Sequence, residues 1–367
     1  MIDLELKNVT KRFGAFTAVK DFSIAVEAGE FVSFLGPSGC GKTTTLRMIA
    51  GFLEPTEGEI FIQGQKVNDL PPYHRDSGMV FQNYALFPHM TVFDNIAFGL
   101  RYRKVPKNEI KDRVMQMLQL VQLPGLEGRR PAQLSGGQQQ RIALARALVI
   151  KPKLLLFDEP LSNLDAKLRE QLRVELRQIQ QEVGITSIFV THDQEEALSL
   201  SDRIVVMNAG EMIQSGTPYE IYEKPQSLFV GEFIGQSSFI DGRVAAVQGT
   251  ETLVELGNGL TMGVSGVGAI AKGDKVKILI RAERISVMQD SAQKHLEGRL
   301  NVLKGVITDV SYLGSNIYYY VRIENNAQFL VIDQMGEKSP LKKNDAVCLE
   351  IGFKSCLCFT SKTKGRV

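Results

Sequence analysis

The chain has 367 residues, of which 44% are hydrophobic and 23% are charged, a composition ordinary for a soluble globular protein. This length exceeds what one compact core usually supports, so two or three domains are expected. The 43 basic and 41 acidic residues give a net charge of +2, which argues against nucleic acid or a charged membrane surface as the main partner. No apolar run approaches the roughly 18–20 residues that span a bilayer, and the N-terminus does not resemble a secretory signal. The cysteines show no metal-binding spacing and suggest free thiols in a reducing compartment.

The first predicted elements are strands. Apolar and polar residues alternate over residues 1–30, which favours antiparallel strands. The apolar run Phe31–Leu35 predicts a buried parallel strand, and residues 44–50 predict a helix. Between them, residues 36–43 read Gly-Pro-Ser-Gly-Cys-Gly-Lys-Thr and fit the phosphate-binding pattern of Gly, four free positions, then Gly-Lys-Ser/Thr.

This loop predicts a nucleoside triphosphate site. Its glycines let backbone N–H groups surround phosphate oxygens, and the helix that follows adds its positive dipole end. Lys42 is expected to reach the β- and γ-phosphates, and the Thr43 hydroxyl to bind Mg²⁺. The alternative, a glycine turn carrying Gly-Lys-Thr by chance, does not account for the flanking strand and helix. The nucleotide is expected to contact Gly36, Pro37, Ser38, Gly39, Cys40, Gly41, Lys42, Thr43 and Thr44.

Cys40 stands inside this loop. A helix N-terminus stabilises a thiolate, and the predicted helix begins just after this residue. We therefore expect Cys40 to be a site of oxidation.

The next elements are a strand and a helix. Residues 59–63 predict a strand that ends in a turn at Gly64, and apolar residues recur at helical spacing over 108–123. Between these elements, residues 84–96 are apolar and aromatic for a loop region. They are expected to form an exposed patch for a partner, while some of them pack inside the protein.

A second glycine-rich motif, Leu-Ser-Gly-Gly-Gln, occupies residues 134–138 and precedes a predicted helix over 142–148. A serine and two glycines at the start of a helix form a second anion-binding end. Two such ends are more than one nucleotide needs. Each is therefore expected to serve a different bound ATP, which requires two copies of the domain.

An apolar strand over 154–157 ends in two adjacent carboxylates, Asp158 and Glu159. Successive strand side chains point in opposite directions, so the two carboxylates are expected to differ in task. Asp158 would hold Mg²⁺, and Glu159 would polarise the water that attacks the γ-phosphate. A helix cap or a solvated turn is the alternative. A helix over 166–183 then separates this strand from another over 187–190, which indicates a parallel sheet.

With these motifs, residues 1–235 resemble the ATP-binding subunits of ABC transporters, whose signature matches residues 134–138. The resemblance implies that Phe13 stacks on adenine; a core aromatic is the alternative for this residue. It also implies that Gln82 contacts Mg²⁺ and water and begins a loop that senses the membrane partner. Asp165 ends the sequence Ser-Asn-Leu-Asp, which matches the loop that communicates across the dimer, and His192 matches the histidine that holds the γ-phosphate.

The resemblance also implies the fold and the assembly. The fold is α/β, a P-loop NTPase domain of the ABC type with an antiparallel β subdomain and a helical subdomain. Because the chain has one set of motifs, it is expected to form a homodimer whose copies pack head to tail around two ATP molecules. Each ATP would meet Lys42, Thr43, Gln82, Asp158, Glu159 and His192 of one copy and Ser135, Gly136, Gly137 and Gln138 of the other.

The character of the chain changes near residue 235. Residues 235–238 read as a linker, and the remainder is strand-like and glycine-spaced. We therefore expect an ABC ATPase domain over 1–235 and a small all-β, OB-like domain over 236–367. Residues 281–284 resemble an Arg-Pro-Glu element of the regulatory β-barrel domain of importer subunits, with Ala282 in place of the proline. Family analogues use this domain for dimer contacts and regulation.

The sequence thus predicts an ATP hydrolase, with ATP and Mg²⁺, that energises solute import. Its expected partners are a second copy, integral-membrane permease subunits and, indirectly, an extracytoplasmic solute-binding protein, with no nucleic acid. Its expected place is the cytoplasmic face of the inner membrane, as a peripheral subunit. A polyamine-type system (spermidine or putrescine) is slightly favoured on overall likeness, and ferric iron, phosphonate or sugar are the alternatives. An exporter subunit commonly lacks an added β-barrel, and a soluble ABC ATPase acting on DNA or ribosomes usually carries coiled coils, zinc sites or two ATPase halves.

Overall fold

The computed structural model describes residues 1–248, 251–257, 259–267, 270–289, 300–324, 326–336 and 340–360. The chain divides into two compact units, residues 1–221 and 222–366. This division lies earlier in the chain than the predicted boundary after residue 235. Among the described residues, every helix is too short or too polar to cross a lipid bilayer.

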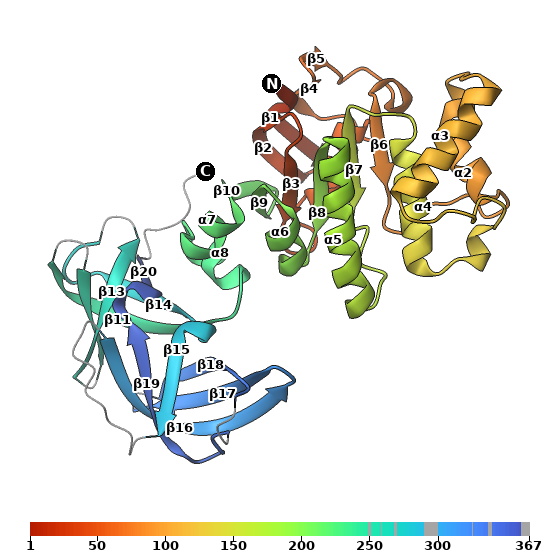
Figure 1. Cartoon of the computed structure of the whole chain (residues 1–367). Helices are drawn as coiled ribbons and strands as arrows, with labels where there is room; N and C mark the ends of the chain where they lie inside the picture. The colour runs from red at the N-terminus through yellow and green to blue at the C-terminus, as the bar shows by residue number, and fades with distance from the viewer. Residues whose placement is uncertain are drawn as a thin grey trace. The chain divides into compact units, whose positions relative to one another are not determined.

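A six-stranded sheet forms the centre of unit 1, in the order β10-β9-β3-β8-β7-β6 (Figure 1). Strands β9, β3, β8, β7 and β6 are parallel, and β10 joins the β9 edge antiparallel. Every residue of β3, β7 and β8 is buried, because helices cover both faces of a parallel sheet. The bounds are β3 (Phe31–Leu35), β6 (Ser77–Val80), β7 (Leu154–Asp158), β8 (Thr186–Thr191), β9 (Arg203–Asn208) and β10 (Glu211–Gly216).

Helix α1 (Lys42–Ala50) follows β3, α5 (Ala166–Val183) connects β7 to β8, and α6 (Gln194–Leu200) connects β8 to β9. Helix α5 has the predicted bounds because both of its ends are capped. Asp165 accepts a hydrogen bond from the N–H of Leu168 at the start, and Gly184 ends the helix with a φ of 67°.

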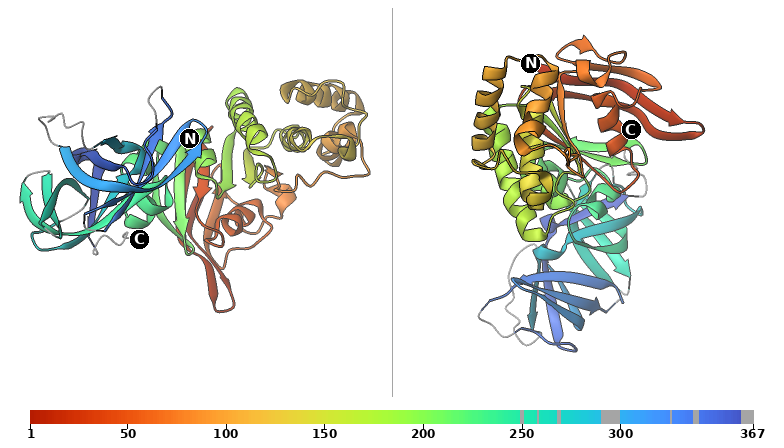
Figure 2. Two further views of the ribbon diagram at one scale, coloured as in Figure 1. Left: turned by 90° about the horizontal axis from the view of Figure 1, so that it is seen from below. Right: turned by 90° about the vertical axis from the view of Figure 1, so that its right-hand side faces the viewer.

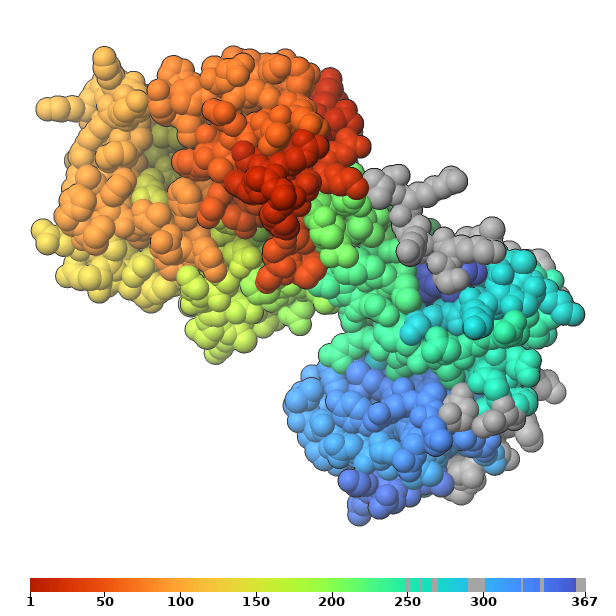
Figure 3. Space-filling view, turned by 180° about the vertical axis from the view of Figure 1, so that it is seen from behind, coloured from red at the N-terminus to blue at the C-terminus, as the bar shows by residue number. Residues whose placement is uncertain are grey.

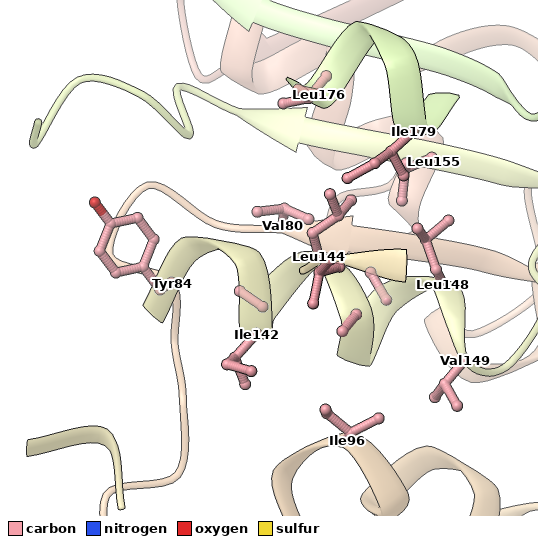
Figure 4. Close-up of a cluster of buried hydrophobic side chains, with 14 of the residues drawn as sticks. Val80, Tyr84, Ile96, Ile142, Leu144, Leu148, Val149, Leu155, Leu176 and Ile179 are labelled. Carbon is pink, nitrogen blue, oxygen red and sulfur yellow. The ribbon is translucent and has the colours of Figure 1, made fainter. Parts of the chain in front are cut away.

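A helical subdomain lies beside the β6 edge of the sheet, as Figures 1 and 2 both show. It consists of α2 (Val92–Tyr102), α3 (Lys107–Leu120) and α4 (Gly136–Leu148). Helix α2 begins inside the segment predicted as a partner-binding loop. Thr91 caps it by accepting a hydrogen bond from the N–H of Asp94. The buried residues of α2 and α4 share one core cluster with β6, β7 and α5 (Figure 4).

An antiparallel sheet, β2-β1-β4-β5, covers the other part of unit 1. Its long hairpin extends away from the rest of the unit in both views of Figure 2. The predicted antiparallel subdomain is therefore present. The bounds are β1 (Ile2–Phe13), β2 (Phe16–Glu27), β4 (Glu57–Ile62) and β5 (Gln65–Lys66).

Helix α7 (Pro218–Glu223) spans the division between the units, and the described part of unit 2 then contains α8 (Leu228–Phe233) and two β layers. Strands β11-β12-β13-β20-β14 close into a barrel, and β15-β19-β16-β17-β18 form a separate five-stranded sheet (Figure 1). The space-filling view of Figure 3 shows the surface of unit 2, with the residues of β11–β14 in green to cyan and those of β16–β18 in blue. Side chains of both layers share one core, so the prediction of a barrel alone missed the second layer. The α/β region with its antiparallel and helical subdomains, followed by an all-β region, confirms the predicted fold class. The bounds are β11 (Ser237–Gln248), β12 (Glu251–Gly257), β13 (Leu260–Val267), β14 (Lys275–Arg281), β15 (Ile285–Gln289), β16 (Leu300–Leu313), β17 (Asn316–Ile323), β18 (Gln328–Gln334), β19 (Ala346–Gly352) and β20 (Cys356–Thr360).

Candidate nucleotide site

The loop over residues 36–43 connects β3 to α1, as predicted, and glycine is needed at two of its positions. Gly41 has a φ of 103°, and a Cβ there would lie 2.5 Å from the carbonyl oxygen of Ala18. A Cβ on Gly36 would lie 2.2 Å from the carbonyl oxygen of Met207. The loop is therefore packed against the backbones of β2 and β9, and its glycines permit that approach.

Lys42 lies within this loop and is only 5% exposed. Its ammonium donates hydrogen bonds to the carbonyl oxygens of Gly36 at 2.7 Å and Pro37 at 2.9 Å. A buried cation held by neutral carbonyls, at the start of a helix, makes the loop electropositive. This is the electrostatic setting that binds phosphate.

Cys40 is buried at the base of the same loop, with its Sγ 3.7 Å from the Lys42 Nζ. Burial raises the pKa of the Cys40 thiol, and this effect exceeds the lowering by Lys42. The expectation of a reactive thiolate is therefore wrong, because desolvation outweighs the nearby charge and the helix start.

Thr43 and Asp158 meet across the carboxyl end of β7. The Thr43 hydroxyl donates to an Asp158 carboxylate oxygen at 2.9 Å, and a guanidinium nitrogen of Arg47 lies 4.0 Å from the other oxygen. Burial raises the pKa of Asp158, against the opposing effects of Thr43 and Arg47. The pair thus presents one hydroxyl and one carboxylate oxygen close together. No sequence motif indicated that Arg47 lies beside this carboxylate.

Glu159 points to a different partner. Its backbone adopts a left-handed conformation, with a φ of 46°, and its N–H donates to the carbonyl oxygen of Val190 at 3.0 Å. One of its carboxylate oxygens lies 3.0 Å from Nδ1 of His192. Asp158 and Glu159 therefore have different side-chain partners. The expected cause, the alternation of side chains along a strand, was wrong. Strand β7 ends at Asp158, so the left-handed turn, and not strand alternation, redirects Glu159.

His192 is positioned by the elements on either side of it. Strand β8 ends at Thr191, and Asp193 caps α6 by accepting hydrogen bonds from the N–H groups of Glu195 and Glu196. The imidazole therefore sits on a short connection that is fixed at both ends.

Gln82 is joined to the segment that follows Glu159. Its side-chain amide donates to the Ser162 hydroxyl at 3.2 Å, and Asn163 donates to the Gln82 carbonyl at 2.8 Å. The Ser162 hydroxyl in turn donates to the carbonyl oxygen of Glu159 at 2.9 Å. Within residues 1–221, all of which are described, no hydrogen bond joins Gln82 to Thr43 or Asp158.

Phe13 and Asp165 are placed elsewhere. Phe13 lies at the end of β1 and is 49% exposed, with the Lys11 ammonium 5.1 Å from its ring centre. It is therefore not a core aromatic, which was the alternative to base stacking. Asp165 accepts a hydrogen bond from the Leu168 N–H as the cap of α5.

The motif at residues 134–138 forms the start of α4, where Ser135 is exposed, Gly136 and Gln138 are half-buried, and Leu134 and Gly137 are buried. Ser135 accepts a hydrogen bond from the N–H of Gln138 at 3.3 Å, and the Gln138 side chain accepts one from the N–H of Ser135 at 3.0 Å. Gly136 and Gly137 form the first turn. In unit 1, no hydrogen bond joins this helix start to the loop over 36–43.

An aromatic face, defined here as Tyr73, Phe87, Phe98 and Tyr102, lies on the helical subdomain side of unit 1. Ring centres are 6.3 Å apart for Tyr73 and Tyr102 and 4.7 Å apart for Phe87 and Phe98. Tyr73, Phe98 and Tyr102 are strongly exposed. The sequence indicated only Phe87. The four-residue spacing of Phe98 and Tyr102 in the sequence indicates this face, since it places both rings on one side of a helix.

The sequence matches two known families. Residues 19–162 match the family described as ABC transporter, and residues 278–359 match the TOBE domain. The chain is also 48% identical over 364 residues to the spermidine/putrescine import ATP-binding protein PotA of Rubrobacter xylanophilus, covering 98% of this chain and 94% of that protein. It is 46% identical over 354 residues to the Fe(3+) ions import ATP-binding protein FbpC of Rhizobium etli, covering 95% of each.

Among solved structures, a post-hydrolysis dimer of the ATP-binding cassette MJ0796, bound to ADP and Pi, is similar to this chain. The TM-score is 0.53 and the sequence identity 36%, and the match covers 59% of this chain and 98% of the other.

Proposed function

Because the chain belongs to the ABC transporter family as an import ATP-binding subunit, we propose that the residues at the carboxyl ends of β3, β7 and β8 form its site of ATP hydrolysis. The chain binds ATP and hydrolyses it to energise the import of a solute. One observation carries the proposed site. Two consecutive carboxylates have different partners, Asp158 with Thr43 and Glu159 with His192.

In the proposed reaction, ATP lies over the loop of residues 36–43 and α1. Phosphate oxygens replace the carbonyl oxygens of the loop as acceptors for the Lys42 ammonium. The positive charge of Lys42 then offsets the negative charge that develops on the γ-phosphate. Phe13 stacks on adenine. Glu159 accepts the proton of the attacking water, and His192 holds the carboxylate in place and contacts the γ-phosphate.

The residues present fit Mg²⁺. The described chain has no cluster of three or more His, Cys, Asp and Glu side chains that could enclose a metal. The Thr43–Asp158 pair instead supplies oxygen ligands beside the phosphate loop, and Mg²⁺ typically binds one or two carboxylates plus substrate phosphates. Thr43, Asp158 and Gln82 would hold the ion. When bound, Mg²⁺ neutralises charge on the phosphates.

A second copy of the chain completes each site in this proposal. The start of α4, with the exposed Ser135 followed by Gly136, Gly137 and Gln138, would bind the γ-phosphate held by the other copy. Asp165 would act at the same interface. The dimeric state of the similar cassette MJ0796 supports this arrangement.

The aromatic face is proposed to dock permease subunits. Three of its four rings are strongly exposed, and an aromatic surface of this kind typically marks a protein contact. It adjoins the segment that begins at Gln82, so docking would influence the hydrolytic site. The subunit would then sit at the cytoplasmic face of the inner membrane and act indirectly with a solute-binding protein.

The proposed solute is a polyamine such as spermidine or putrescine. Several of the similar import proteins carry the name PotA, a spermidine/putrescine import ATP-binding protein. Ferric iron is the alternative, since FbpC proteins are similar at nearly the same identity.

The proposed chemistry is tested by Glu159→Gln. The amide keeps the size of the side chain but cannot accept the proton of water, so turnover should fall about 10²–10³-fold while ATP binding remains. ATPase assays and size-exclusion chromatography with ATP would measure this, and the variant should accumulate as an ATP-bound dimer. Glu195→Gln, an exposed glutamate on α6, is the control. Ordinary hydrolysis by Glu159→Gln would disprove the assignment.

A further inference from the structure

The backbone directly after Gln82 is strained. Tyr84 and Ala85 both adopt left-handed conformations, with φ values of 60° and 48°. Two consecutive residues other than glycine in this region are uncommon, and each is costly unless its surroundings impose it. Tyr84 also donates its N–H to the carbonyl oxygen of Phe81 at 2.9 Å, so the strained turn encloses Gln82.

Arg146 of α4 imposes this conformation. Its two terminal guanidinium nitrogens donate to the carbonyl oxygens of Ala85 at 2.7 Å and Tyr84 at 2.9 Å. The planar fork of arginine matches two adjacent acceptors in a way that other cations cannot. The same guanidinium lies 5.5 Å from the ring centre of Phe87, two residues further along.

In the described part of the chain, the two carbonyl oxygens are the hydrogen-bond acceptors of Arg146. Among the described residues, no carboxylate forms an ion pair with it, and its pKa is lowered by burial alone. A desolvated cation without a counter-ion depends on the hydrogen bonds it makes. Loss of the two carbonyls would therefore leave a half-buried charge without these acceptors, and loss of the guanidinium would leave the strained turn unsupported.

The surroundings of the turn restrain it further. The Tyr84 ring belongs to the same buried cluster as Ile142 and Leu144 of α4 (Figure 4). Asn95 of α2, fully buried, accepts from the N–H of Phe87 at 2.8 Å and donates to its carbonyl at 3.1 Å. The turn is thus held between the helix that begins at Ser135 and the helix that carries much of the aromatic face.

We propose that Arg146 is a positioning residue that clamps the turn after Gln82 to α4 and so keeps Gln82 in place for hydrolysis. This inference rests on the proposed function in assigning Gln82 to the hydrolytic site. The clamp joins the last turn of α4 to the Gln82 segment, so that the helix and the segment move as one body. Release of the clamp lets Tyr84 and Ala85 relax to negative φ and displaces Gln82 and Phe87 together.

The clamp can be measured without ATP, because the chain contains no tryptophan. Phe87→Trp places a single fluorophore next to Arg146 in the full-length chain. Adding Arg146→Gln should raise the acrylamide quenching constant of that tryptophan about twofold, since the ring loses its cover. Phe61→Trp on β4, whose ring lies 4.8 Å from the Lys7 ammonium, is the control reporter and should not respond.

Arg141→Gln is the matched control substitution. Arg141 lies on the same helix and pairs with Glu175, far from the turn in its contacts. It should leave the quenching of the Phe87→Trp reporter unchanged even if it lowers stability. Unchanged quenching with Arg146→Gln, or an equal response to Arg141→Gln, would overturn the clamp.

Second substitutions that restore activity distinguish a positioning role of Arg146 from a role in stability alone. Arg146→Gln should lower kcat for ATP about tenfold with little change in KM, and Arg146→Lys should recover part of it. Ala85→Gly in the Arg146→Gln background should also recover kcat, because glycine adopts a left-handed φ without strain. Because Ala85→Gly also relieves strain in the fold, the free energy of unfolding is measured beside kcat, and a purely structural role would make kcat recover only to the extent that stability recovers.

The outcomes distinguish this inference from the proposed function. If quenching responds but kcat does not, the link between the clamp and hydrolysis is overturned. If Glu159→Gln hydrolyses ATP normally, the proposed site itself fails, whatever the fluorescence shows.

Discussion

The left-handed backbone of Glu159 gives two consecutive carboxylates different partners. Asp158 completes a buried strand and meets Thr43, whereas Glu159 turns into the left-handed region and meets His192. Strain of this kind persists only where the surroundings require it, and it is concentrated at functional sites. The same holds for Tyr84 and Ala85 beside Gln82.

Asp158 leads to a prediction about pH and stability. Burial raises its pKa above the ordinary 3.8, so the folded chain binds a proton more readily than the unfolded chain. The ionised carboxylate therefore lowers stability above the raised pKa, and this cost disappears as the pH falls through it. Asp158→Asn should raise the Tm of the metal-free protein at pH 7.5, and the gain should shrink towards pH 4 in calorimetry.

Asp94 is the control with the opposite sign. Hydrogen bonds from Thr91 and Arg101 lower the pKa of Asp94, so its ionised form stabilises the folded chain above its unfolded pKa. Asp94→Asn should therefore lower the Tm at pH 7.5, and the loss should vanish as the pH falls through the lowered pKa. A lower Tm for Asp158→Asn at pH 7.5 would contradict the account of Asp158.

Helix α2 serves both the core and the surface. Val92 and Ile96 are fully buried, whereas Phe98 and Tyr102 face outward on the aromatic face. The sequence pattern over residues 84–96 left open whether the apolar residues were core or contact surface. The structure divides them, because a helix directs residues four apart to one side.

The aromatic face leads to a prediction about docking. Replacing Tyr73 and Tyr102 together by serine removes two exposed rings that contact each other, so co-purification of permease subunits from membranes should fall at least about tenfold. Mass spectrometry with an isotope-labelled standard would measure it. Tyr219→Ser, at an equally exposed tyrosine on α7, is the control. Undiminished recovery of permease with the double variant would reject this face as the docking surface.

The proposed assembly of each hydrolytic site from two copies would explain why the start of α4 stands apart from Lys42. Helix α4 begins with an exposed, fully capped Ser135, and no hydrogen bond within unit 1 brings it to the phosphate loop. A second copy would supply it, through an interface that uses the same surfaces on both subunits.

Mixed dimers test this assembly. Ser135→Arg should inactivate both sites of its own dimer, and so should Lys42→Ala. Equal mixing should restore about a quarter of wild-type ATPase, because about half of the dimers are mixed and each of these has one intact site. Activity titrated over mixing ratios would measure this. The absence of recovery at every ratio would rule out the shared site.

The sequence by itself determined the local elements of this protein. The phosphate loop, the buried strand before it, the capped helix over 166–183 and the paired carboxylates follow from spacing and residue type, which act over a few residues. It also indicated the family, since Leu134–Gln138 is a distinctive motif, and the fold class follows from both.

Only the tertiary structure decided which distant segments meet. It joined Arg146 to Tyr84 and Ala85, and Tyr73 to Tyr102, and it packed a second β sheet against the barrel of unit 2. Periodicity reports whether a residue is buried but not what it is buried against. Desolvation likewise depends on packing, which is why the sequence suggested a thiolate at Cys40 whereas burial in the folded chain raises the pKa of its thiol.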